Sequence, residues 1–193
     1  MNDLNNYTQT LRCKNCGSLG RRKGLFICQI CYDANLKLMF EIEKNRKVFY
    51  PEIDQINQNI YLGNYDGQKE KDKLKEYGIK GIMVCGSFLN TFHPEEFTYL
   101  VFDIDDSLYQ NIEEYFDKAY DFIEKIEKVY VHCAAGISRS SSFVIAYLMR
   151  KNNWSFEKSY EYVKSKRDII CPNSNFVKQL KEYGIKLTNN NLG

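Results

Sequence analysis

The 193-residue sequence lacks the features that define several large classes of protein. It has no run of the roughly 18 apolar residues that a membrane-spanning helix needs, so we expect no membrane association. Its first residues form neither a basic nor an apolar stretch, and we expect no secretory signal. No internal repeat is visible, and a net charge of +2 does not favour nucleic acid as a partner of the whole chain. With 44% hydrophobic and 27% charged residues, the composition is that of a folded globular protein.

Charge is distributed unevenly along the chain. Residues 1–50 carry a net charge of +5, residues 51–150 a net charge of −7, and residues 151–193 a net charge of +4. The first change falls near Pro51, where we place a domain boundary. We predict a small module with a connecting helix in 1–50, the main domain in 51–188, and a frayed tail in 189–193.

The seven cysteines form one cluster and three isolated positions. An odd total without a secretory signal favours a reducing compartment, so we expect a cytoplasmic or nuclear protein rather than a disulfide framework. In such a compartment, two Cys-x2-Cys pairs eleven residues apart predict one structural zinc ion, with disulfides or an iron centre as the alternatives. Because so short a segment cannot build a core, the metal would supply its folding energy. The four predicted ligands are Cys13, Cys16, Cys28 and Cys31.

Basic residues lie between the two cysteine pairs, at Arg21, Arg22 and Lys23. A basic zinc ribbon can bind nucleic acid, but no aromatic residue alternates with these charges before Phe26. We therefore favour a structural module or one that docks a protein partner over a nucleic-acid-binding module.

The remainder of the chain alternates between strand patterns and helix patterns. This alternation predicts an α/β fold, with a central, largely parallel sheet flanked by helices, beside the small N-terminal zinc ribbon-like module. We expect an antiparallel strand pair in 53–62, further strands at 79–85, 99–102 and 129–132, and helices at 111–126, 143–149, 156–163 and 176–183. Asn111 is the expected N-cap of the first long helix.

The segment from Val131 to Ser140 joins a predicted buried strand to a predicted apolar helix. The start of a helix presents unpaired N–H groups and a positive dipole end, so this junction favours an anion. Gly136 allows successive N–H groups to point inward, and Arg139 offers a planar fork to two phosphate oxygens. The predicted phosphate-binding positions are Ala134, Ala135, Gly136, Ile137, Ser138 and Arg139.

Cys133 precedes these positions and is the expected nucleophile. A free thiol with a pKa near 8.5 is only ~3% thiolate at pH 7, and we expect the anion-binding surroundings to lower that pKa. The thiolate can attack a bound phosphoryl group and form a cysteinyl-phosphate without a catalytic metal, because the N–H groups and Arg139 stabilise the charge. Ser140 can donate a hydrogen bond to the sulfur and ease its departure. His132 either orients the loop and helps to hold the thiolate or is a satisfied core histidine.

The pattern His-Cys-x-x-Gly-x-x-Arg-Ser at 132–140 resembles that of the dual specificity protein phosphatases, which belong to the cysteine-dependent phosphatases. The resemblance spans about residues 52–186. It implies the cysteine-phosphatase fold and hydrolysis of phosphotyrosine, and of phosphoserine or phosphothreonine, in phosphoprotein substrates. Further similar segments are Tyr61–Gly63, Gln110–Ile112, Ile145–Met149, Cys171–Asn173, Phe176 and Gln179–Leu180.

A general acid is needed to protonate the leaving oxygen, and three carboxylates follow the strand that ends near Phe102. In the resembled family the acid lies a few residues before the helix that begins here near Asn111. Asp106 fits that position best, Asp105 is the second choice, and we expect Asp103 at the strand end.

The remaining alternatives concern substrate and redox chemistry. Phosphoinositide-specific relatives carry lysines in this loop, and this sequence has none there. RNA-triphosphatase relatives carry Asn before the Arg and Thr after it, whereas this sequence has Ser138 and Ser140 at those positions. A phosphate-reading adaptor with little activity and an RNA 5′-phosphatase stay open as alternative functions. Some relatives pair a cysteine placed like Cys85 with the nucleophile, although a core cysteine is the preferred interpretation.

Overall fold

The computed structural model describes residues 10–12, 19–21 and 52–190. The chain divides into two units, residues 1–50 and residues 51–193. In the first unit, strands β1 (Thr10–Arg12) and β2 (Leu19–Arg21) pair in antiparallel fashion. The four clustered cysteines and the predicted connecting helix lie outside the described residues.

The second unit is built on a mixed sheet of five strands in the order β3-β4-β7-β5-β6. The β3–β4 pairing is antiparallel, and the other three pairings are parallel. β7 therefore lies at the centre of the sheet, as we expect of the strand that leads into the phosphate-binding loop. The strands are β3 (Ile53–Gln55), β4 (Ile60–Gly63), β5 (Gly81–Cys85), β6 (Thr98–Phe102) and β7 (Val129–His132).

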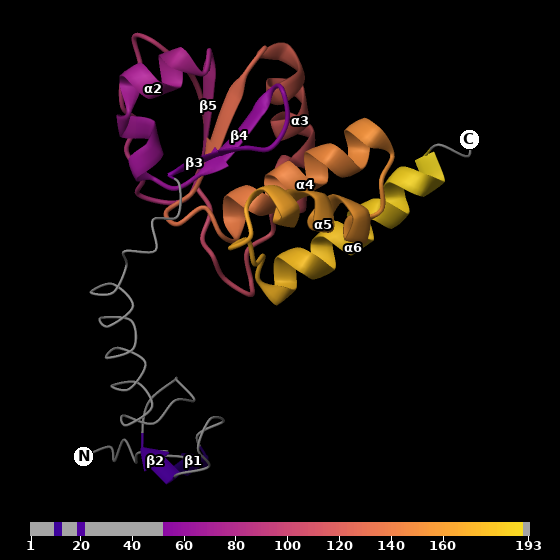
Figure 1. Cartoon of the computed structure of the whole chain (residues 1–193). Coiled ribbons are helices and arrows are strands. Elements are labelled where there is room, and N and C mark those ends of the chain that lie inside the picture. Colours follow the sequence, from indigo (N-terminus) through magenta and orange to yellow (C-terminus); the bar gives the residue numbers. More distant parts are fainter. Residues whose placement is uncertain (1–9, 13–18, 22–51, 191–193) are drawn as a thin grey trace, which may run out of the picture. The chain divides into compact units, whose positions relative to one another are not determined.

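Helices cover both faces of this sheet. Figure 1 shows α2 on one side of it and α4, α5 and α6 on the other. Two short 3-10 turns, Asp66–Lys69 and Glu113–Tyr115, precede α2 and α3. The α-helices are α2 (Lys71–Glu76), α3 (Phe116–Lys125), α4 (Arg139–Asn152), α5 (Phe156–Lys166) and α6 (Ser174–Asn190).

The two-residue period of the strands separates the core into two layers. On β5, Ile82 and Val84 pack in one cluster with Leu74 of α2, while Met83 and Cys85 pack in the other cluster with residues of α4. Residues 140–149 of α4 are all buried. A helix buried all round needs no amphipathic stripe, which is why residues 143–149 form a continuous apolar segment.

Two helix starts differ from the sequence prediction. α4 begins at Arg139, ahead of the apolar segment. The hydroxyls of Ser141 and Ser142 can be buried in this first turn because each donates to a backbone carbonyl one turn earlier. α3 begins at Phe116 and not after Asn111, because the side chain of Asn111 accepts the Glu113 N–H and starts a 3-10 turn instead. α6 extends as far as Asn190, into the predicted tail.

Among the helices of the described residues, none has the combination of length and apolar character that would let it cross a bilayer.

Candidate active site

The loop 133–138 connects the end of the central strand β7 to the start of α4. Gly136 has φ +69°, a conformation that strains any residue with a side chain. A Cβ atom there would lie 2.4 Å from the carbonyl oxygen of Gly63 on the neighbouring strand. Glycine is therefore required at this position, for backbone conformation and for space.

The sulfur of Cys133 lies at the base of the loop, where the residue is only 2% exposed. The Gly136 N–H donates to Sγ at 3.2 Å, and the Ser140 hydroxyl donates to it at 3.2 Å. Both groups are donors, and donors stabilise an anionic sulfur. The arrangement therefore suits a thiolate.

The beginning of α4 is open to an anion. Ser138 is its N-cap residue, yet the Ser138 side chain makes no capping hydrogen bond to the helix. The first N–H groups of the helix are thus left for a ligand, and Ala134 and Ala135 are exposed beside them. Arg139 Nε is buried, and no hydrogen-bond partner for it occurs within 52–190. Another nitrogen of the Arg139 guanidinium, Nη1, donates to the Ile104 carbonyl at 3.4 Å. A guanidinium with an unsatisfied Nε beside the first N–H groups of a helix is a suitable binding site for a phosphate.

His132 is fully buried behind the loop. Its Nδ1 lies 3.3 Å from the carbonyl oxygen of Cys133, and its ring stacks on that of Tyr130 with centroids 5.4 Å apart. Burial lowers the pKa of His132 to about 4, so the ring is neutral at pH 7. Its hydrogen bond goes to the Cys133 backbone and not to the sulfur, which is the geometry of a residue that orients the loop.

The three candidate acids have different surroundings. Asp106 Oδ2 lies 3.9 Å from Arg139 Nε, and its Oδ1 accepts hydrogen bonds from Ser138 and Asn173. Asp105 accepts instead from the Ser87 hydroxyl at 2.8 Å. Asp103 is exposed directly after β6. Of the three, the structure brings Asp106 to the phosphate-binding loop.

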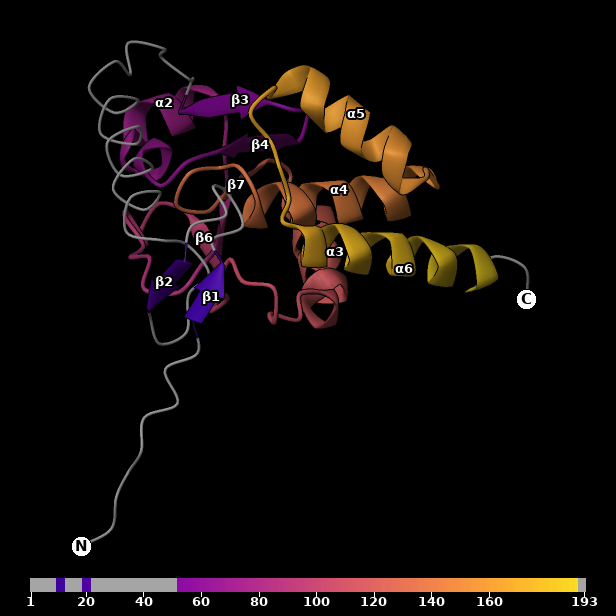
Figure 2. The same cartoon turned by 90° about the horizontal axis from the view of Figure 1, so that it is seen from below.

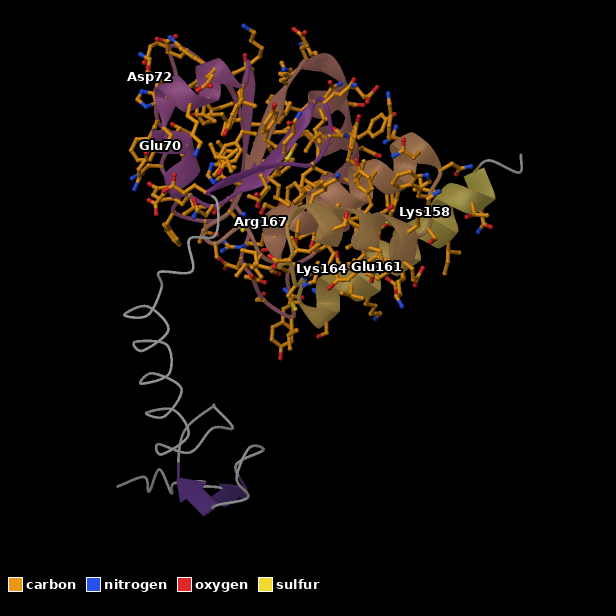
Figure 3. All side chains as sticks on the ribbon, viewed as in Figure 1. Glu70, Asp72, Lys158, Glu161, Lys164 and Arg167 are labelled. Atoms are coloured by element: carbon orange, nitrogen blue, oxygen red, sulfur yellow. The ribbon has the colours of Figure 1, made fainter. Side chains whose placement is uncertain are left out.

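Arg167 contacts the loop from behind and was not identified from the sequence. It is 3% exposed and lies between the end of α5 and the sheet (Figure 3). Its guanidinium donates to the carbonyl oxygens of Gly136 (2.9 Å) and Ala135 (3.2 Å) and forms an ion pair with Asp54 of β3 at 2.6 Å. Arg167 holds these carbonyls away from the site. The N–H groups of the same peptide units therefore point toward the site. Because Arg167 is 31 residues from Gly136, no local pattern could reveal this contact.

The isolated cysteines differ from Cys133. Cys85 ends β5, next to β7 in the sheet, and burial raises the pKa of its thiol well above the ordinary value. Such a thiol is held in its unreactive neutral form. Cys171 is exposed, and its backbone N–H donates to the Ile137 carbonyl of the loop at 2.9 Å. Within the part of the chain that the structure describes, no group of three or more His, Cys, Asp or Glu side chains could hold a metal ion.

Comparisons with known proteins agree with this geometry. Dual specificity protein phosphatase 1 of Arabidopsis thaliana is 38% identical over 131 residues, which cover 66% of this chain and 66% of that protein. The tyrosine-protein phosphatase yvh1 of Schizosaccharomyces pombe is 37% identical over 145 residues, which cover 71% of this chain and 44% of that protein. The chain therefore spans less than two thirds of the length of these relatives.

Solved structures share the fold as well as the sequence. The crystal structure of a human tyrosine phosphatase-like serine/threonine/tyrosine-interacting protein has a TM-score of 0.68 and 34% identity, and the match covers 70% of this chain and 97% of that one. The family model of the dual specificity phosphatase catalytic domain matches residues 60–186, which include the loop at Cys133, the strand before it and the helix after it. With this match over most of its length, the chain belongs to the dual specificity phosphatase family.

Proposed function

We propose that the chain hydrolyses phosphotyrosine, and also phosphoserine or phosphothreonine, in proteins through a cysteinyl-phosphate intermediate. The observation that carries the proposal is the pair of donors on Cys133 Sγ beneath a helix start that has no side-chain cap. A nucleophile and an anion-binding site that share one loop place the sulfur in line with a bound phosphoryl group.

The proposed reaction has two steps. Cys133 Sγ attacks phosphorus, the bond to the leaving oxygen breaks, and Asp106 gives that oxygen a proton. Asp106 then takes a proton from a water molecule whose oxygen attacks phosphorus, and the S–P bond breaks to restore the thiolate. The loop N–H groups and Arg139 stabilise the charge on the three other phosphate oxygens in both steps. The Ser140 hydroxyl, at 3.2 Å from Sγ, stabilises the departing sulfur.

A substrate panel tests this proposal. Turnover of matched phosphotyrosine and phosphothreonine peptides is measured beside release of phosphate from triphosphate-ended RNA. We expect turnover of the peptides and none of the RNA, because the side chains of the loop add no cation for a multiply charged substrate at Ala134, Ala135, Ile137 or Ser138. Preferential turnover of RNA would establish the RNA 5′-phosphatase instead. Phosphopeptide binding without turnover of any substrate would establish the adaptor.

The N-terminal cysteines form the second part of the proposal. Cys13, Cys16, Cys28 and Cys31 would bind one structural zinc ion in a module that docks a protein partner in the cytoplasm or nucleus. Support comes from the spacing and from the antiparallel strands β1 and β2, which precede and follow the first cysteine pair in the sequence.

Metal analysis tests the zinc site. The purified chain should contain about one zinc ion per molecule, and the double variant Cys13→Ser/Cys16→Ser should lose it because two thiolate ligands are gone. Cys171→Ser, which alters an exposed cysteine outside the module, is the matched control and should keep the metal. A zinc-free wild-type chain, purified without chelators, would disprove the site.

A further inference from the structure

The two carboxylate oxygens of Asp106 have different surroundings. Oδ1 accepts the Ser138 hydroxyl at 2.8 Å and the Asn173 side-chain amide at 2.7 Å, whereas Oδ2 faces Arg139 Nε at 3.9 Å. We propose that Asn173 is a positioning residue, which with Ser138 fixes Asp106 so that Oδ2 alone exchanges the proton with substrate. The inference rests on the proposed function, in which Asp106 is the general acid.

The directions of the hydrogen bonds follow from the groups involved. The backbone N–H of Asn173 donates to Ser138 Oγ at 3.1 Å, so that oxygen acts as an acceptor there. A hydroxyl has a single proton, and the proton of Ser138 is therefore directed to Asp106 Oδ1. The Asn173 Nδ2 amide is also a donor. With two donors on Oδ1, the acidic proton of Asp106 belongs on Oδ2.

Oδ2 is also the oxygen on the reactive side of the carboxylate. We assign the guanidinium of Arg139 to phosphate binding. Asp106 forms its ion pair with this guanidinium through Oδ2. A proton on Oδ2 passes to the leaving oxygen as the P–O bond breaks. The same atom, now unprotonated, accepts a proton from water as the S–P bond breaks.

Asn173 is held in place by a hydrogen bond to α6 and by the attachment of the preceding segment to the phosphate-binding loop. Its side-chain oxygen accepts the Phe176 N–H at 3.0 Å and so caps α6. Two residues earlier, the Cys171 N–H donates to the Ile137 carbonyl of the phosphate-binding loop. Figure 2 shows the chain that enters α6 passing beside the start of α4. Asp106 lies in an irregular segment after β6, so the rigid helix start supplies the precision that its own segment lacks.

The side chain of Ser138 supports the same inference. Ser is a preferred N-cap residue, and Ser138 occupies the N-cap position of α4, yet its hydroxyl bonds to Asp106 and Asn173 instead of the helix. This leaves the helix N–H groups for phosphate and couples the acid to the phosphate-binding loop through one hydroxyl. The loop thus positions the acid as well as the phosphate.

The test uses the full chain with Asn173→Ser. Serine keeps an N-cap oxygen for α6 but is too short to reach Asp106. Turnover is measured on aryl phosphates that differ in leaving-group acidity. We expect kcat to fall about tenfold or more for poor leaving groups, since displaced catalytic groups cost up to ~10²-fold, and less than about threefold for good ones, which need little protonation. Asn175→Ser is the matched control, because Asn175 donates to the Gln110 carbonyl from the same helix turn without contacting Asp106.

A second variant protects the test from a folding artefact. Asn173→Asp also retains the capping oxygen but places a carboxylate against Asp106, and like charge disfavours the ionised form of both groups. We expect the basic limb of its pH–rate profile to move to higher pH, which a purely structural role for Asn173 would not produce.

The outcomes separate this inference from the proposed function. If Asn173→Ser lowers turnover equally for all leaving groups, or not at all, while Asp106→Ala still depends strongly on the leaving group, the positioning role is wrong and the general acid stands. If Asp106→Ala turns over poor leaving groups like the wild type, the assignment of the acid fails, and with it the inference.

Discussion

Replacement of Cys133 by serine should reduce turnover of an aryl phosphate on the order of 10⁴-fold or more, while inorganic phosphate still binds. Serine keeps the shape of the side chain, but its hydroxyl does not ionise near neutral pH and is a far weaker nucleophile than a thiolate. The groups assigned to the anion are unchanged by the substitution, because they are loop N–H groups and the Arg139 guanidinium. Steady-state kinetics and phosphate titration measure the two effects separately.

Cys171→Ser is the matched control for this variant. Cys171 is exposed and contacts the loop through its backbone N–H, which serine retains, so its turnover should remain within about twofold of the wild type. Wild-type-like turnover by the Cys133 variant would refute the cysteinyl-phosphate mechanism. Loss of phosphate binding together with turnover would show that the loop had been disrupted.

Replacement of Asp106 by alanine should slow turnover of poor leaving groups by ~10²- to 10³-fold, because a positioned general acid contributes about 10²- to 10⁴-fold. Without the carboxyl group, no side chain at this position protonates the leaving oxygen. The basic limb of the pH–rate profile should flatten, since in the wild type that limb records the loss of the proton from the acid. Activated aryl phosphates should be affected much less.

Asp105→Ala separates this assignment from its neighbour. The side chain of Asp105 accepts its hydrogen bond from the Ser87 hydroxyl and not from the loop 133–138, so its removal should leave the basic limb in place. If Asp105→Ala flattens that limb while Asp106→Ala does not, the acid has been assigned one residue too late. Thermal unfolding of both variants shows whether either change acts through stability.

The nucleophile loop was readable from the sequence because its constraints are local. A strand that ends in His132, a glycine at position 136 and an apolar helix after Ser140 follow from neighbouring residues, and the same backbone determines where the N–H groups point. The alternation of strands and helices likewise identified the α/β class and the central strand. The start of α3 was predicted wrongly at Asn111, because the cap side chain bonds to a 3-10 turn that the helical period does not reveal.

The sequence by itself determined the chemistry of this protein: a thiol, a helix start, a glycine and an arginine within one short loop. The tertiary structure alone decided what holds that loop and directs the acid. Arg167 bonds to Gly136 of the loop, 31 residues away along the chain, and is itself held by Asp54, which is 113 residues from Arg167. Asn173 bonds to Asp106 across 67 residues. Contacts of this kind depend on how strands and helices pack, and no residue spacing encodes them. The physical reason is that backbone conformation is set by neighbours in sequence, whereas the orientation of a catalytic side chain is set by neighbours in space.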